Sequence, residues 1–93
     1  MKDVSVTYNP SLERYEIYVA GELVGHAVAR RRGGLVTMPH VEIDSDQRGK
    51  NLANILVRTA LEDIRVRGER VVAQCPFVLA FLRRYREYSD LVA

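Results

Sequence analysis

The most informative segment of this chain is DQRGKNLA, at Asp46–Ala53. It lies between an alternating apolar segment, LVTMPHVEI, and a long helical pattern, LANILVRTALEDIRVRG. Gly49 lets a backbone approach a ligand without a Cβ in the way, and Arg48 and Lys50 add positive charge. The start of a helix offers unpaired N–H groups and a partial positive charge, which suit a phosphate. The spacing alone also fits a solvated turn with surface charges.

The helix predicted after this turn is amphipathic, with one apolar face that packs on a sheet. Gly68 is a plausible C-cap for it. Its apolar arc is formed by Leu52, Ile55, Leu56, Ala60 and Ile64, and its polar arc by Asn54, Arg58, Glu62 and Arg65.

Upstream of the turn, four segments have the alternation of β-strands. Ala20-Gly21-Glu22 and Gly33-Gly34 are hairpin turns between them. Pro39 interrupts the fourth strand, which indicates an edge position or a bulge. The four predicted strands cover residues 4–8, 14–19, 23–32 and 35–43.

Downstream of the helix, RVVAQC is predicted to be a short strand buried on both faces, because it is nearly all apolar. Pro76 stands at a natural helix start. The segment FVLAFLRRY continues as a helix, with Phe77, Ala80, Phe81 and Tyr85 close together. The tail REYSDLVA is left unassigned. The result is a mixed α/β layer fold, in which a four-stranded antiparallel sheet is followed by a helix, a strand and a helix.

Length and composition set the limits for this fold. A chain of 93 residues predicts one small domain, residues 1–93. Its net charge of +2 argues against nucleic-acid binding, which usually needs a heavily basic domain. A single cysteine excludes an intramolecular disulfide and fits a reducing compartment. Without a signal-peptide pattern or a spanning apolar run, we expect a cytoplasmic protein that does not engage a membrane.

The stretch DQRGKNLANILVRTALEDIR after VEI resembles the acetyl-CoA-binding motif of the GNAT acetyltransferase superfamily, Gln/Arg-x-x-Gly-x-Gly/Ala. Gly49 matches the central glycine. Asp46 replaces the Gln/Arg and Asn51 replaces the second small residue, where its side chain would crowd a pyrophosphate. These two departures are expected to affect the affinity for acetyl-CoA more than the fold. Typical companions of the motif are Arg48, Lys50, Leu52 and Ala53.

Four motifs, PHVEI, RGKNLA, VVAQCPFVLAFL and YREYSDLV, occur in the order and spacing of a compact GNAT-like subgroup, related to the N-acetyltransferase domain-containing proteins. The likeness runs from about Leu35 to the C-terminus and departs at Tyr85-Arg86, where the subgroup often has His-Pro. It implies a minimal GNAT fold, with acetyl-CoA in a V-shaped opening between the fourth and fifth strands. The residues that it implies for CoA binding are Val41, Glu42, Ile43, Gln47, Arg48, Gly49, Lys50, Asn51, Leu52 and Ala53.

Acyl transfer to an amine needs a base for the amine proton and an acid for the departing thiolate. His40 and Glu42 share one face of a strand, and His40 suits the base; a surface or fold-stabilising pair is the other interpretation. Cys75, before a helix N-terminus, suits the acid or a nucleophile because that position favours a thiolate. It can equally be a small buried core residue.

Six further residues carry weaker signals. His26 is interpreted as structural. Tyr85 and Tyr88 are alternative proton donors, and at least one of them is expected in the core. The arginines of Arg30–Arg32 are interpreted as a solvated hairpin end.

The predicted function is that of an acetyl-CoA-dependent N-acetyltransferase, which transfers the acetyl group directly to a protein lysine or a small amine. The alternative is a non-catalytic CoA-binding or protein-interaction module with the same fold. A third, nucleic-acid binding through the arginines, has little support from the charge. No metal site is predicted.

Overall fold

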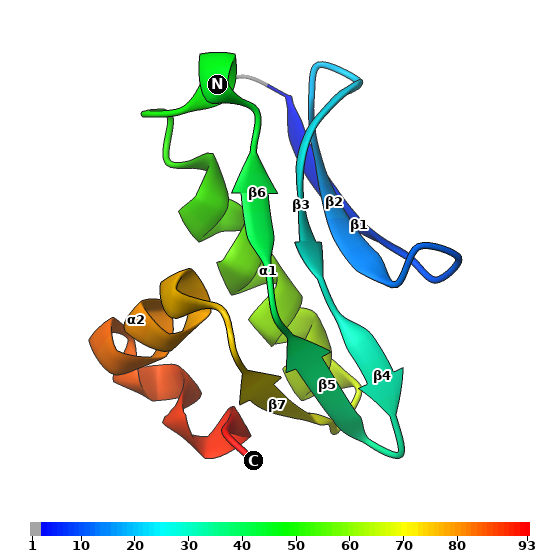
Figure 1. The fold of residues 1–93 in the computed structure, drawn as a ribbon, viewed down its shortest axis with the longest axis vertical. Helices are drawn as coiled ribbons and strands as arrows, with labels where there is room; N and C mark the ends of the chain where they lie inside the picture. The colour runs from blue at the N-terminus through cyan, green and yellow to red at the C-terminus, as the bar shows by residue number, and fades with distance from the viewer. Residues whose placement is uncertain (1–2) are drawn as a thin grey trace.

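The computed structural model describes residues 3–93, drawn in Figure 1. Strands and helices occur in the predicted order, with two short 3₁₀ helices in addition. The elements are β1 (Val4–Asn9), β2 (Arg14–Val19), β3 (Glu22–Val28), β4 (Arg30–Arg32), β5 (Leu35–Met38), β6 (Val41–Ile43), η1 (Ser45–Gln47), α1 (Leu52–Val66), β7 (Arg70–Ala73), α2 (Pro76–Arg84) and η2 (Arg86–Leu91).

The predicted antiparallel sheet of four strands is confirmed, and its strands lie in the order β1-β2-β3-β6. Gly25, in β3, lies opposite Ile43 of β6. A Cβ on Gly25 would come within 2.6 Å of both the Glu42 carbonyl oxygen and the Ile43 Cδ1 atom. Only glycine therefore permits this close approach of β3 and β6.

A second, smaller sheet has the order β4-β5-β7, with β5 antiparallel to β4 and parallel to β7. Two strands that we predicted as continuous are therefore each divided between the two sheets. One break falls at Ala29, whose N–H donates to the Glu13 carbonyl across 2.9 Å. The other falls at Pro39-His40, where proline has no N–H to continue a ladder.

Helix α1 packs against strands of both sheets and runs behind β5 and β6 in Figure 1. Its buried face includes Val57 and Leu61, which the predicted arc omitted, whereas Ile55 is only half-buried. Neither α1 nor any other helix in residues 3–93 combines the length and apolar character needed to cross a membrane. The largest fully buried side chains of the core are Tyr15, Tyr88, Ile17, Met38, Leu56, Leu61 and Ile64.

Strand β7 differs from the prediction in two ways. It ends at Ala73, and it lies at an edge of its sheet, so only Val71 is fully buried. The C-terminal tail covers part of this edge, because Val92 forms a parallel bridge with Val71. The unassigned tail is thus an ordered part of the fold, whose 3₁₀ helix and single bridge have no periodic apolar pattern for sequence reasoning to detect.

Candidate functional site

The site begins where consecutive strands part into different sheets. Strand β5 pairs with β7, whereas β6 pairs with β3 and has no strand on its other side in the described residues. The His40 carbonyl and the Asp44 N–H both bond to β3. Because backbone groups alternate along a strand, the N–H and C=O groups of Val41 and Ile43 point to the free edge.

The chain leaves β6 through η1 and a turn that leads directly into α1. Gly49 has φ +83° and Asn51 has φ +64°, both in the left-handed region. Nothing lies within 4 Å of where a Cβ on Gly49 would stand, so its surroundings are open. Asn51 is the N-cap residue of α1, but its side chain makes no capping bond to the helix. The first N–H groups of α1 are therefore available to a ligand.

These two features line one groove of about 970 Å³. It brings together most of the residues predicted for CoA binding, but Lys50 is not in its lining. The Lys50 ammonium instead donates to the Gln47 side-chain carbonyl across 3.1 Å. The lining residues are His40, Val41, Glu42, Ile43, Asp44, Ser45, Asp46, Gln47, Arg48, Gly49, Asn51, Leu52, Ala53, Asn54 and Phe77.

The charged side chains of the groove's loop are not predominantly basic. Two acidic residues, Asp44 and Asp46, lie in the same lining as Arg48. All three are exposed. An anionic ligand would therefore be held by backbone N–H groups and the helix dipole more than by side-chain charge.

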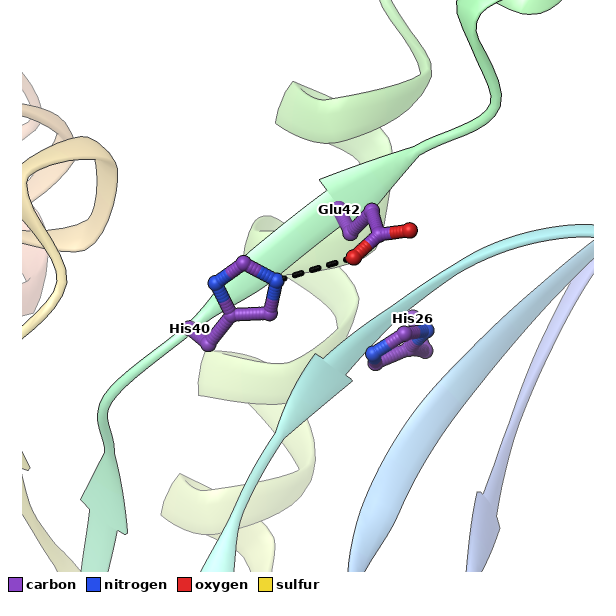
Figure 2. Close-up of side chains that lie close together, drawn as sticks. All are labelled: His26, His40 and Glu42. Atoms are coloured by element: carbon purple, nitrogen blue, oxygen red, sulfur yellow. Dashed lines mark hydrogen bonds and ion pairs between the residues drawn. The ribbon is translucent and has the colours of Figure 1, made fainter.

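His40 and Glu42 lie side by side at the groove, and His40 Nε2 is 3.0 Å from Glu42 Oε1 (Figure 2). An ionised carboxylate only accepts, so Nε2 carries a proton, and in the neutral ring Nδ1 then keeps its lone pair. The hydrogen bond from His40, aided by the charge of His26, holds the pKa of Glu42 below its usual value. Burial, with the positive charge of Arg14, lowers the pKa of His26.

The sequence also matches a family model, "GCN5-related N-acetyl-transferase", over residues 14–91. This chain belongs to the GCN5-related N-acetyltransferase family. The predicted GNAT resemblance is confirmed, and the family supports an N-acetyltransferase. No curated protein matches the chain.

Solved structures share the GCN5-related fold at low identity. A GCN5-like protein from Staphylococcus aureus, solved by NMR, superimposes with a TM-score of 0.73 at 15% identity, over 100% of this chain and 91% of that one. The ribosomal-protein-S18-alanine N-acetyltransferase from Escherichia coli gives 0.69 at 11%, over 90% and 76%. A ribosomal-protein-alanine N-acetyltransferase from Brucella melitensis gives 0.57 at 22%, over 86% and 60%.

Cys75 does not join the other predicted catalytic residues of this GCN5-related domain. It lies two residues beyond the end of β7, as the N-cap residue of α2, and is 6% exposed. Its N–H donates to the Met38 carbonyl across 3.1 Å. Among the described residues it belongs to the core rather than to the groove lining.

The tyrosines of the C-terminal segment also lie outside the groove lining among residues 3–93. Tyr88 is in the core, as expected for at least one of the two. Its hydroxyl donates to Glu62 across 2.6 Å and accepts from Arg58 across 3.0 Å. Burial and the bond to Glu62 raise its pKa. Tyr85 is half-buried, with its ring 4.5 Å from that of Phe81.

Sequence reasoning missed five groove residues: Asp44, Ser45 and Asp46 of the loop, Asn54 and Phe77. Asn54 was assigned to the solvent arc of the helix, although it lies in the first turn, where side chains border a ligand at the helix start. Phe77 was assigned to the apolar cluster of α2. The buried residues of α2 are Val78, Phe81 and Leu82, whereas Phe77 is exposed; its helical spacing to Ala80 and Phe81 gave no sign of this.

Proposed function

We propose that this protein is an acetyl-CoA-dependent N-acetyltransferase that transfers the acetyl group directly to an amine. One observation carries the proposal. The free edge of β6 and the uncapped start of α1 line a single groove, which also contains the His40–Glu42 pair. The groove therefore offers backbone partners for an extended amide chain, donors for a phosphate and a base.

In this proposal the pantetheine arm lies along β6. Its amides pair with the outward backbone groups of Val41 and Ile43, as an added strand would. The pyrophosphate lies at the turn of Gly49 and Asn51, where the first N–H groups of α1 donate to its oxygens. Gly49 serves here because its φ of +83° is unfavourable for a residue with a side chain.

The chemical step proposed here needs one protein base. The amine nitrogen attacks the thioester carbonyl carbon, the new C–N bond forms, and the C–S bond breaks as CoA leaves as a thiolate. His40 Nδ1 takes the proton that the amine loses. Glu42 orients the ring through Nε2 and stabilises the imidazolium that results. The thiolate takes its proton from water in the open groove, so the buried thiol of Cys75 is not required.

A non-catalytic CoA-binding module is the second candidate. The two acidic residues in the loop, Asp44 and Asp46, favour it because they lower the attraction of the site for a polyanion. It retains the groove and the ligand but assigns no chemistry to His40.

The test separates binding from transfer. Untagged protein is mixed with acetyl-CoA and a panel of lysine peptides and polyamines, in buffer with a metal chelator, and acetylated products are identified by mass spectrometry. The proposal predicts acetyl-CoA binding by calorimetry together with an acetylated amine. Binding without transfer across the panel would support the second candidate. Absence of binding would contradict both.

Gly49→Val is a useful variant in the same experiment. It introduces a β-branched side chain at a left-handed position, which distorts the turn without touching the core. We expect weaker acetyl-CoA binding. Gly33→Val, at the β4–β5 hairpin, also lies at positive φ, with open space around its Cβ position. Gly33→Val therefore introduces a backbone strain comparable to that of Gly49→Val but outside the groove, and acetyl-CoA binding should be unchanged.

A further inference from the structure

His26, His40 and Glu42 form a cluster that the proposed reaction does not fully use. His26, on β3, lies directly opposite Glu42 on β6. His40 precedes Glu42 by two residues, so its side chain emerges on the same side. Figure 2 shows the three side chains gathered on one side of the two strands. One ligand-type atom from each lies within 4.8 Å of those of the other two.

Two of these three atoms already have nearly the spacing that tetrahedral coordination of an ion requires. Ligand bonds of about 2.0–2.2 Å place neighbouring donor atoms roughly 3.3 Å apart in a tetrahedral site. The atoms of His40 and Glu42 are already 3.0 Å apart. Their side chains are 55% and 57% exposed, so they can rotate and an ion can reach them. The ligand atom of the half-buried His26 lies within 4.8 Å of the other two, so its ring must move closer when an ion binds.

We propose that His26, His40 and Glu42 bind a divalent ion of the zinc class, with water completing the coordination. Two imidazoles and one carboxylate are a ligand set typical of zinc sites that keep an open position. Imidazole nitrogen also favours such transition metals over magnesium or calcium, which prefer oxygen ligands. The sequence did not predict this site, because only the pairing of β3 with β6 brings His26 next to Glu42.

One acidic neighbour on the adjacent strand is not available as a further ligand. Glu16, on β2, lies opposite His26 from the other side. Its carboxylate already accepts hydrogen bonds from Arg14, Tyr18 and Asn9. Glu16 is thereby engaged by these donors, with its Oε2 atom 2.8 Å from Arg14 Nε, and is not itself a ligand.

Metal binding would change the state of His40. Coordination through Nε2 replaces the hydrogen bond to Glu42, and the neutral ring then carries its proton on Nδ1. His40 Nδ1 then has no lone pair with which to accept the proton of the amine, the role proposed for it above. The ion is therefore an inhibitor of acetyl transfer, a consequence that depends on the proposed function, whereas the binding itself does not.

The experiment titrates untagged protein, without acetyl-CoA, with zinc chloride in a non-coordinating buffer. Calorimetry measures the stoichiometry, and histidine ring signals are followed by NMR. We expect one ion per chain, shifts of both imidazoles, and reversal by chelator. His26→Ala should weaken binding by more than about a hundredfold, because removal of an outer hydrogen-bond partner of a metal site already costs roughly 10–100-fold.

Two variants test the assignment of ligands. Asp44→Asn removes the nearest acidic side chain along the chain, and Cys75→Ala removes the only thiol; both should bind zinc as the wild type does. Binding that survives His26→Ala unchanged, or that is lost in Asp44→Asn or Cys75→Ala, would overturn the site. Circular dichroism of each variant checks its fold. If acetyl transfer is observed, zinc should inhibit the wild type and not His26→Ala.

Discussion

At the scale of single residues, His40 tests the chemistry most directly. His40→Gln keeps a hydrogen-bond donor toward Glu42 but cannot accept the amine proton. We expect kcat to fall roughly a hundredfold, a typical contribution of a general base, with acetyl-CoA affinity unchanged by calorimetry. Glu42→Gln, which leaves the base in place, should lower kcat less. Equal kcat for His40→Gln and wild type would reassign the pair to a surface contact.

Labelling and substitution of Cys75 test whether this residue belongs to the core or to the catalytic site. Because its thiol is buried, we expect a thiol reagent to label the native protein slowly and the urea-unfolded protein quickly. Cys75→Ala should lower the free energy of unfolding by about 1–2 kcal/mol, since it removes a packed atom. Its kcat per folded molecule should match wild type. Rapid native labelling that bound CoA prevents would restore the predicted acid role.

At the scale of elements, the contact between β3 and β6 positions the groove. Gly25→Ala forces a Cβ against the Glu42 carbonyl and the Ile43 side chain. We expect a loss of about 1–3 kcal/mol in unfolding free energy, as for other overpacked sites, together with weaker acetyl-CoA binding because β6 shifts. Urea unfolding and calorimetry measure the two effects.

Gly34→Ala is the matched control for that substitution. Gly34 has open space around it and φ +85°, so alanine there costs only backbone strain, about 1–2 kcal/mol. It lies in the β4–β5 hairpin, so acetyl-CoA binding should stay normal. If Gly25→Ala binds acetyl-CoA like wild type, the position of β6 does not control the site.

Most elements were predictable because their patterns are local. The period of α1 and the alternation of β1 reflect one buried face, which a sequence displays directly. The division of LVTMPHVEI between two sheets was not predictable. Pro39 marked an interruption, but the partners of Met38 and Val41 are set by contacts far along the chain.

The candidate site was predictable only where its residues are adjacent in the sequence or lie on one strand. The turn at Gly49 and the start of α1 are adjacent in sequence, so the motif identified them together. The placement of His40 beside Glu42 followed from strand alternation. The burial of Cys75 and the approach of His26 depend on how β7 and β3 pack, which no local pattern reveals.

At the scale of the whole molecule, one buried carboxylate couples stability to pH. Burial alone would raise the pKa of Glu16, but hydrogen bonds from Arg14, Tyr18 and Asn9 outweigh it and hold the pKa below its usual value. A carboxyl group with a lowered folded-state pKa stabilises the fold above its unfolded pKa of about 4.3. This stabilisation is lost as pH falls through the folded-state value.

Glu16→Gln therefore has a pH-dependent cost. Urea unfolding of wild type and variant at pH 7, and at steps below about pH 4.3, should give a difference that is largest at neutral pH. The difference should shrink as Glu16 becomes protonated. A difference that stays constant across this range would mean that the network around Glu16 does not depend on its charge.

The most direct test of the account is an amide-shift titration of the protein with acetyl-CoA, because the groove joins backbone groups from two elements. We predict that the largest shifts fall on Val41, Ile43 and residues 48–54. Small shifts should occur at Arg30–Arg32 and along β1. Shifts concentrated at the arginine hairpin, or no shifts at millimolar ligand, would contradict acetyl-CoA binding at the edge of β6 and the start of α1.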